Sequence, residues 1–246
     1  MAIRINATGE YLKRTASLPS GSAWSMSCWF YVTAQASVEQ CMMILQDWGG
    51  SQFAQLMFNT TNQLVVDSNI DSTVLDATGS NWQDKWVFAA ITANGSVATA
   101  YVWRLTDASP TTNSCNILSI TPNNMFVGSS ADDAYTNGKY AHIKVWDAAL
   151  TQAVFEQERW SAKPVRRTNL HLWSPLIVDS HDYSGAGKDW TEGGTLTYED
   201  GPPVGWGGVK HVIGAPALVN PIFALTALQS PVAGTCTMRV RAKIVV

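Results

Sequence analysis

The segment Trp24-Ser-Met-Ser-Cys-Trp-Phe-Tyr-Val32 decides the fold, because the character of its side chains changes from one residue to the next. Apolar side chains occupy every second position, at Trp24, Met26, Cys28, Phe30 and Val32, and the positions between them hold Ser25, Ser27, Trp29 and Tyr31. A period of two is the pattern of a β-strand that places one face in a protein core. The segment is therefore predicted to be a strand.

Similar runs recur about every ten residues along the first two thirds of the chain. They are rich in β-branched and aromatic residues and cover residues 42–45, 53–58, 63–66, 86–92, 99–104, 125–128 and 140–146. Asn- and Gly-rich turns separate them, at 48–50, 59–62, 93–96, 122–124 and 136–138. Such turns close antiparallel hairpins, and antiparallel strands with one apolar face need two stacked sheets. One short helix is predicted over residues 152–160, with Thr151 as its N-terminal cap.

Composition predicts a globular chain, since hydrophobic residues make up 46% of the 246 residues and charged residues only 14%. The net charge is −3, but all 19 acidic residues precede residue 201. The remainder carries the basic residues Lys210, Arg239, Arg241 and Lys243 and no acidic one. We therefore expect two parts with different partners: a sandwich over residues 1–203 and an extended arm over residues 204–246.

The arm has two distinct stretches. Residues 212–236 are apolar and almost uncharged, and Pro216, Pro221 and Pro231 forbid a continuous helix, so this stretch is expected to be extended and covered. The final stretch alternates again, with basic Arg239, Arg241 and Lys243 opposite apolar residues that include Val240 and Ile244. It suits a strand that anchors the chain on a partner's sheet edge. The alternative is a strand that completes the chain's own sandwich.

Several classes of function are not supported. The N-terminus lacks the pattern of a secretory signal peptide, and no stretch is long enough to insert into a membrane. The four cysteines have no C-x-x-C spacing, so we expect buried free thiols rather than zinc ligands or a disulfide scaffold. Basic residues are too few for nucleic-acid binding.

Three segments in order resemble the laminin-G-like jelly rolls of the concanavalin A-like lectin/glucanase superfamily. The early strand is Trp24-Ser-Met-Ser-Cys-Trp-Phe-Tyr-Val32, the central hairpin covers residues 85–102, and the late strand and short helix cover residues 125–130 and 137–152. With residues 172–176 and 182–185, the likeness extends over residues 1 to about 203. It implies an all-β, two-sheet antiparallel jelly-roll sandwich with one short helix, followed by the extended C-terminal arm. His142 and Lys144 stand where the family usually has an acidic pair, so no role of those acids transfers.

Catalysis is not expected. The Glu-x-Asp-x-x-Glu spacing of the glucanases in this superfamily is missing, and the one close glutamate pair, Glu156 and Glu158, lies on the predicted helix with its members facing different sides. No nucleophile elbow, P-loop or dinucleotide fingerprint is present. A glucanase-like glycoside hydrolase remains the third and most distant alternative.

Carbohydrate binding is better supported, because sugar sites combine aromatic rings with carboxylates and amides. The loop residues Asp47, Trp48, Asp132, Asp133 and Tyr135 have this chemistry and are the candidate site. The alternative interpretation is that Trp48 packs over a sheet edge and the aspartates cap turns. No cofactor is expected, although Asp132 with Asp133, or Asp179 with Asp182, supply some of the oxygen ligands that calcium needs.

Together these features resemble the surface or decoration proteins of tailed bacteriophages. The expected protein is a non-catalytic structural or display protein of the virion surface, made in the host cytoplasm. Its sandwich would contact cell-surface glycans weakly, and its arm would dock on other virion or shell proteins or form a homo-oligomer. The alternative is a free carbohydrate-binding lectin that gains avidity from several weak sites in a homo-oligomer.

Overall fold

The computed structural model describes residues 1–7, 9–19, 21–33, 38–47, 52–118, 120, 122–129 and 136–204. The chain divides into two compact units, residues 1–211 and 212–246, and all described residues belong to the first. The predicted arm from residue 205 onward lies outside the described residues, with Arg239, Val240, Arg241, Lys243 and Ile244. Within the described part, no helix is long and apolar enough to cross a membrane.

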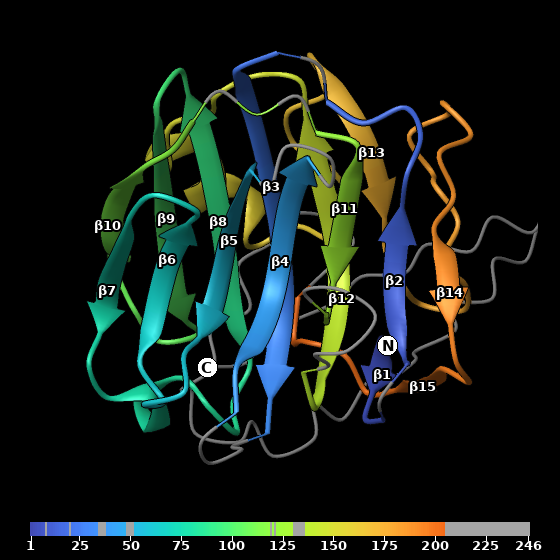
Figure 1. Ribbon diagram of the computed structural model, residues 1–246. Helices are drawn as coiled ribbons and strands as arrows, with labels where there is room; N and C mark the ends of the chain where they lie inside the picture. Colours follow the sequence, from blue (N-terminus) through green and yellow to red (C-terminus); the bar gives the residue numbers. More distant parts are fainter. Residues whose placement is uncertain are drawn as a thin grey trace, which may run out of the picture. The chain divides into compact units, whose positions relative to one another are not determined.

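The described residues form two antiparallel sheets, as predicted (Figure 1). Sheet A has eight strands, in the order β10-β9-β8-β3-β12-β1-β15, with β13 paired to β12 beside this path. Its members are β1 (Ala2–Ile5), β3 (Ala23–Val32), β8 (Val87–Asn94), β9 (Val97–Arg104), β10 (Thr111–Asn116), β12 (Gly138–Trp146), β13 (Leu170–Ser174) and β15 (Thr197–Glu199). The all-β, two-sheet prediction is therefore confirmed.

Sheet B has seven strands and lies in front of sheet A in Figure 1. Its order is β14-β2-β11-β4-β5-β6-β7. Its members are β2 (Tyr11–Arg14), β4 (Gln40–Asp47), β5 (Gln52–Phe58), β6 (Leu64–Ser68), β7 (Ser72–Asp76), β11 (Asn124–Val127) and β14 (Thr191–Gly193). A short 3-10 helix, η1 (Gly79–Asn81), follows β7.

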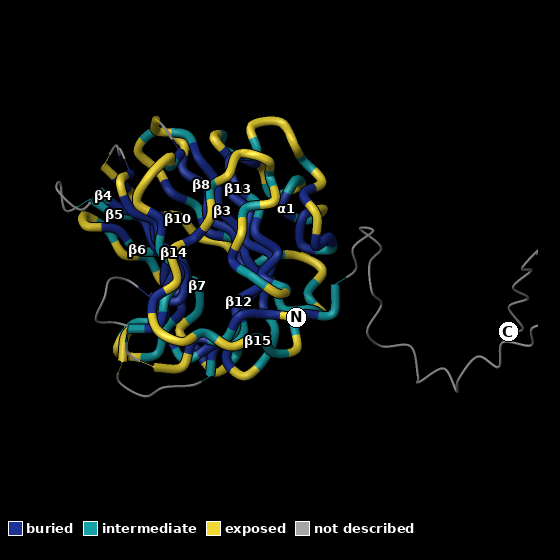
Figure 2. The backbone as a smooth tube through the Cα atoms, turned by 90° about the vertical axis from the view of Figure 1, so that its right-hand side faces the viewer, coloured by how far each residue is buried: buried dark blue, intermediate teal, exposed yellow. Residues whose placement is uncertain are grey.

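The main core fills the space between the sheets, where Figure 2 shows the buried residues gathered. The side chains of β3 divide as predicted: Trp24, Met26, Cys28, Phe30 and Val32 all belong to this core. The intervening Trp29 belongs to a second cluster on the outer side of sheet A. β3 is thus buried on both sides, with one face in the main core and the other in the second cluster.

The predicted helix is α1 (Gln152–Glu158), which ends two residues before its predicted end at Trp160. Thr151 stands at the N-cap position, but its side chain makes no capping hydrogen bond. Its backbone carbonyl oxygen instead accepts from Val154 and Phe155 N–H, so the predicted side-chain cap is wrong. The described cysteines, Cys28, Cys41 and Cys115, are buried free thiols as predicted.

Two positions of the sheets have an irregular backbone conformation. The register of β12 against β3 shifts between Ala141 and Lys144, and His142 adopts a φ of 54° at this bulge. Gly128, after β11, has a φ of 80°, and a Cβ there would lie 2.2 Å from the Ile5 Cδ1 atom. Position 128 therefore requires glycine for its conformation and for its close packing.

Candidate functional site

The outer side of sheet A is closed by α1 and the segment that follows it. Large aromatic side chains fill the space beneath, including Trp29, Phe88, Trp103, Trp146 and Phe155, and each is at most 1% exposed. This part of the face is therefore a second core.

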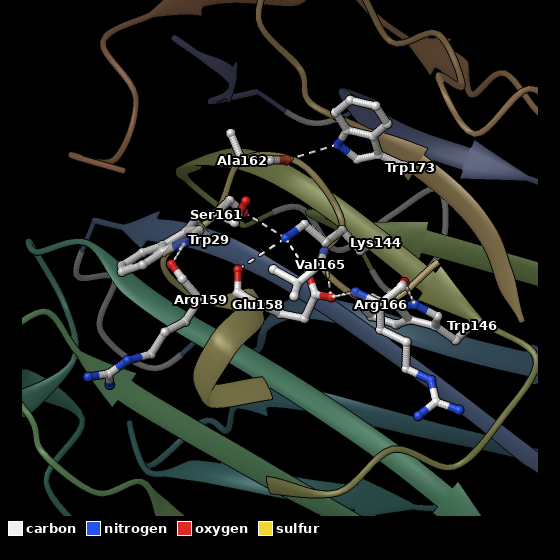
Figure 3. A network of polar contacts seen from close by, with 10 residues as sticks. All are labelled: Trp29, Lys144, Trp146, Glu158, Arg159, Ser161, Ala162, Val165, Arg166 and Trp173. Carbon is white, nitrogen blue, oxygen red and sulfur yellow. Dashed lines mark hydrogen bonds and ion pairs between the residues drawn. The ribbon is translucent and has the colours of Figure 1, made fainter. Parts of the chain in front are cut away.

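Three indole groups hold the segment 159–166 against this face, as Figure 3 shows. They come from adjacent strands β3, β12 and β13, and each donates its N–H to a backbone carbonyl oxygen. The distances are 3.0 Å from Trp29 to Arg159, 2.9 Å from Trp146 to Arg166 and 3.0 Å from Trp173 to Ala162. Buried tryptophan N–H groups usually find such partners, and here they fasten a loop to a sheet.

A buried ion pair completes this attachment (Figure 3). The Lys144 Nζ donates to the Glu158 Oε2 at 2.7 Å and to the backbone oxygens of Glu158 and Ser161 at 3.0 and 2.6 Å. The other carboxylate oxygen, Oε1, accepts from Val165 and Arg166 N–H at 2.9 and 2.6 Å. Burial lowers the pKa of Lys144, and the charge and hydrogen bond of Glu158 oppose that shift. Lys144 and Glu158 therefore serve the fold.

The outer side of sheet B carries a different set of side chains, which we call the sheet B face. Its strands alternate, because Leu12, Leu45, Ala54, Val66 and Met125 enter the main core and their neighbours point outward. The outward members are Tyr11, Lys13, Cys41, Ile44, Gln46, Phe53, Gln55, Met57, Val65, Asp67, Asn124 and Phe126. A buried apolar cluster of Cys41, Ile44, Met57, Val65 and Phe126 therefore lies beside amide and charged groups on this side. Mostly apolar linings with a few polar groups are typical of small-ligand sites.

The strand register aligns five of these residues in a row across the sheet. Lys13 pairs with Phe126, Phe126 with Ile44, Ile44 with Gln55, and Gln55 with Asp67. Such directly paired residues have neighbouring Cβ atoms. The row thus brings a cation, an aromatic ring, an amide and a carboxylate from five strands together.

Aromatic contacts organise one end of the face. The Tyr11 and Phe126 rings meet edge-on with centroids 6.0 Å apart, and the Lys13 Nζ lies 5.1 Å from the Phe126 ring centroid. Tyr11 and Lys13 remain partly exposed while Phe126 is buried. The phenol ring and the ammonium group are therefore the accessible groups at this end.

Two polar atoms at the centre of the face have no hydrogen-bond partner among the described residues. They are the Gln46 Nε2 and the Gln55 Oε1, on residues that are 8% and 7% exposed. The Gln55 Nε2 is engaged, since it donates to the Asp67 Oδ2 at 2.9 Å. An unpaired buried donor or acceptor costs about 1–3 kcal/mol, so a donor and an acceptor on adjacent strands mark a place for a ligand hydroxyl or a water.

Of the five residues predicted for carbohydrate binding, only Asp47 lies in the described part. It ends β4 beside this face, and the Asn123 Nδ2 donates to its Oδ1 at 2.8 Å. Trp48, Asp132, Asp133 and Tyr135 lie outside the described residues. The residues flanking the 130–135 loop are placed: Gly128 N–H and the Thr136 hydroxyl donate to the Met42 and Cys41 carbonyl oxygens. That loop therefore starts at the opposite end of β4 from Asp47.

Several of the described carboxylates are engaged in structural contacts. Glu158 is buried in its ion pair and Glu156 accepts from Gln152, so the two glutamates face different sides as predicted. The Asp182 oxygens accept from the Trp173, Ser184 and Lys188 N–H groups and the Ser184 hydroxyl. Among the described residues, no group of three or more His, Cys, Asp or Glu could hold a metal ion. Calcium stays a prediction for the Asp132 and Asp133 loop.

The histidines offer no catalytic arrangement within the described residues. The His171 Nδ1 lies 2.7 Å from the Asp147 Oδ2, but its Nε2 meets the backbone oxygen of Ser17 rather than a nucleophile. His142 is buried at the bulge of β12, and burial together with the positive charge of Lys144 lowers its pKa to about 3. A neutral, enclosed imidazole of this kind is a packing residue.

Comparisons with known proteins agree with this architecture. The family model Laminin_G_3, described as the concanavalin A-like lectin/glucanases superfamily, matches residues 6–154. No curated protein sequence matches the chain.

Among solved structures, a putative carbohydrate binding protein from Bacteroides ovatus is similar, with a TM-score of 0.59 and 14% identity over 84% of this chain and 62% of that one. Tailspike protein 2 from an Escherichia coli O157:H7 bacteriophage has a TM-score of 0.53 and 13% identity over 72% of this chain and 28% of that one. The chain thus spans under two thirds of either protein, and at these identities the likeness concerns the fold alone. On the family match, the chain belongs to the concanavalin A-like lectin/glucanases superfamily.

Proposed function

We propose that this protein binds carbohydrate without catalysis, through the sheet B face, and is displayed on a virion surface. The observation that carries the proposal is the pair of unpartnered amide atoms, the Gln46 Nε2 and the Gln55 Oε1. A sugar hydroxyl both donates and accepts, so sugar hydroxyls carry the partner that each of these atoms lacks. The partly exposed rings of Tyr11 and Phe53 supply apolar surface for the faces of sugar rings.

The proposed absence of catalysis rests on the described carboxylates. Glycoside hydrolysis requires an acid and a second carboxylate at a fixed separation across the glycosidic bond. Asp67 supplies a carboxylate to the row of paired residues on the sheet B face, and its Oδ2 accepts a hydrogen bond from Gln55. The row contains no second carboxylate that could act as its partner in hydrolysis. Incubation of the protein with a panel of polysaccharides is expected to release no reducing ends. Reproducible release that survives further purification would show that the protein is a hydrolase.

Binding is tested on a glycan array and then by calorimetry with the best glycan. Gln46→Leu keeps the size of the side chain and removes the donor, and we expect it to weaken binding about tenfold. Gln157→Leu is the matched control, because Gln157 is exposed on α1, over the outer side of sheet A. Equal affinities of the wild type and both variants would place the glycan site elsewhere. Binding that only Gln157→Leu weakens would do the same.

The virion role rests on the arm and on the fold that the chain shares with a tailspike protein. In this proposal the basic, alternating residues Arg239, Arg241 and Lys243 and the apolar Val240 and Ile244 anchor the chain on a shell protein. A free lectin is the second candidate, favoured by the likeness to a carbohydrate binding protein. In that case the arm closes a homo-oligomer.

Deletion of residues 205–246 separates these two candidates. If the full-length protein and the truncated protein are both folded monomers and only the truncated protein fails to associate with particles, the result supports docking of the arm on a virion. Loss of a defined oligomer, measured by light scattering, supports the lectin. Unchanged mass and unchanged particle association would remove the arm from both proposals.

A further inference from the structure

A separate hollow lies outside the sheet B face, where β13 ends. Its volume is about 220 Å³, and its lining residues are Trp173, Pro175, Ile177, Val178, Asp179 and Tyr183. Pockets for drug-sized ligands occupy roughly 300–1,000 Å³, so this hollow suits a small head group. It is open to solvent, since Val178 is 66% exposed and Tyr183 is 48% exposed.

The walls of the hollow are held in place by Asp182. Its Oδ1 accepts from Trp173 N–H at 3.1 Å and from Ser184 N–H at 2.8 Å, and Tyr183 N–H donates to the Trp173 carbonyl oxygen at 2.7 Å. The loop after residue 178 therefore pairs with the free edge of β13. Two aromatic side chains are brought together as a result: the Trp173 and Tyr183 rings have centroids 6.0 Å apart and an interplanar angle of 59°.

The polar atoms of the two aromatic walls are already engaged. The Trp173 Nε1 donates to the Ala162 carbonyl oxygen at 3.0 Å, and the Tyr183 hydroxyl donates to the Asp179 Oδ2 at 2.9 Å. The second oxygen of Asp179 accepts from His181 N–H at 3.2 Å. The hollow consequently presents apolar side chains, aromatic rings and one carboxylate. A ligand that needs several hydrogen bonds, such as a neutral sugar, finds few partners there.

The surroundings of the hollow are negatively charged. A hydrogen bond to Asp179, burial, and the charges of Asp179 and Asp189 raise the pKa of Tyr183. A hydrogen bond to Asp189 and the nearby charges of Asp189, Asp179 and Glu192 raise the pKa of the exposed His181. Both shifts have the direction that a negative potential produces. Asp179 therefore supplies negative charge at the hollow, while Asp189 is paired with His181 at 3.0 Å.

We propose that this hollow binds a quaternary ammonium group, such as the head group of choline. Such a cation has an apolar surface and no hydrogen-bond donor, so it matches a hollow whose polar atoms are engaged. Aromatic rings attract cations at their faces, and quaternary ammonium ligands are characteristically bound this way. Asp179 supplies the counter-charge. This site is independent of the sheet B face and of the glycan that the face binds.

The test is calorimetry on the full-length protein with choline chloride and with 3,3-dimethylbutan-1-ol, its neutral carbon isostere. Choline is expected to bind, and the isostere is expected to bind at least about tenfold more weakly, because shape alone does not attract it. Binding of choline should weaken as salt is added, because the Asp179 charge is near the surface. Equal affinity for the two probes, or no binding of choline, would overturn the proposal.

Variants test the walls. Tyr183→Leu removes the ring and should weaken choline binding about tenfold, whereas Tyr183→Phe keeps the ring and should change it less than about twofold. Asp179→Asn should weaken it about fivefold, and Glu156→Gln, the same change on α1, should leave it unchanged. Unchanged affinity in both Tyr183→Leu and Asp179→Asn would refute the site, as would a neutral sugar that competes with choline. The Gln46→Leu variant should bind choline with the affinity of the wild type. Failure of the glycan proposal can therefore be distinguished from failure of the choline proposal.

Discussion

Replacement of Lys144 tests the buried pair most directly, because its Nζ makes three contacts in a site that is 1% exposed. Lys144→Met fits the same space but leaves the Glu158 carboxylate buried with two backbone N–H donors and no cation. Breaking one side of a buried ion pair costs about 3–5 kcal/mol. We expect a loss of unfolding free energy in this range.

The double variant Lys144→Met/Glu158→Leu makes the sharper prediction. Replacing both members of a buried pair by apolar residues is often neutral, because the desolvation penalty disappears with the charges. Here the pair also binds four backbone groups, namely the carbonyl oxygens of Glu158 and Ser161 and the N–H groups of Val165 and Arg166. The Glu158 carbonyl oxygen keeps the Ser161 N–H as a partner at 3.2 Å, so three groups are left unpaired. Each costs about 1 kcal/mol or more, so we expect the double variant to lose about 3 kcal/mol.

Urea unfolding followed by tryptophan fluorescence measures these losses. With a slope of about 3 kcal/mol per M, a loss of about 3 kcal/mol lowers the urea midpoint by roughly 1 M. Glu156→Gln, on the same helix, is the control and should leave the midpoint unchanged. A double variant within about 1 kcal/mol of the wild type would refute the reasoning, because the backbone of residues 158–166 would then hold its position without the pair.

Three further predictions concern other parts of the sandwich. Burial and the Lys144 charge lower the pKa of His142 to about 3 from 6.5, so the unfolded chain binds a proton at this residue before the folded chain does as the pH falls. The contribution of the neutral His142 to the free energy of unfolding is therefore complete above pH 6.5 and declines toward pH 3. At pH 5 it is reduced by about 2 kcal/mol. His142→Asn, which tolerates the φ of 54°, should remove that part of the loss between pH 7.5 and pH 5, and an identical pH profile would contradict it. Gly128→Ala should lower the free energy of unfolding in urea by about 2 kcal/mol or more, because position 128 has a φ of 80° and an added Cβ would contact Ile5. Gly185→Ala is the control and should cost less, because position 185 has a φ of 90° but open space around it. Equal losses in the two variants would contradict the packing argument. Asp182→Ala removes the acceptor of the Ser184 and Lys188 N–H groups, so amide hydrogen exchange at these two residues should become faster while exchange in β3 stays slow. Unchanged exchange at Ser184 and Lys188 would show that the carboxylate does not hold the loop.

The strands that the sequence predicts are those whose alternation extends over several residues. β3, β5 and β8 combine long runs of alternating or apolar side chains, and the period of two is visible without any knowledge of their partners. β10, with the sequence Thr-Thr-Asn-Ser-Cys-Asn, has one buried residue and was not predicted. β14 and β15 have three residues each, too few to show a period. Short edge strands depend on their neighbours rather than on their own pattern.

The sheet B face could be predicted only in part. Gln55 lies inside a predicted strand, but a polar residue at an alternate position is typical of any solvent-facing strand. Its alignment with Ile44 and Asp67 depends on the register, which shifts at a bulge between Cys41 and Met43. The pairing of Lys144 with Glu158 arises because α1 returns over sheet A. Neither contact has a local signal in the sequence, whereas the loop residues Asp47, Trp48, Asp132, Asp133 and Tyr135 do.

The pairing of β1 has a consequence for synthesis of the chain. This strand, Ala2–Ile5, lies between β12 and β15, so its partners are residues 138–140 and 197–199. A ribosome adds about 5–20 residues per second, and the first strand therefore waits roughly 10–40 s for its second neighbour. One edge of the strand can pair once residues 138–140 follow, but its other edge has no partner for the whole of that time, which invites association between nascent chains. The order of synthesis thus leaves this strand half paired until nearly all of the sandwich has been made.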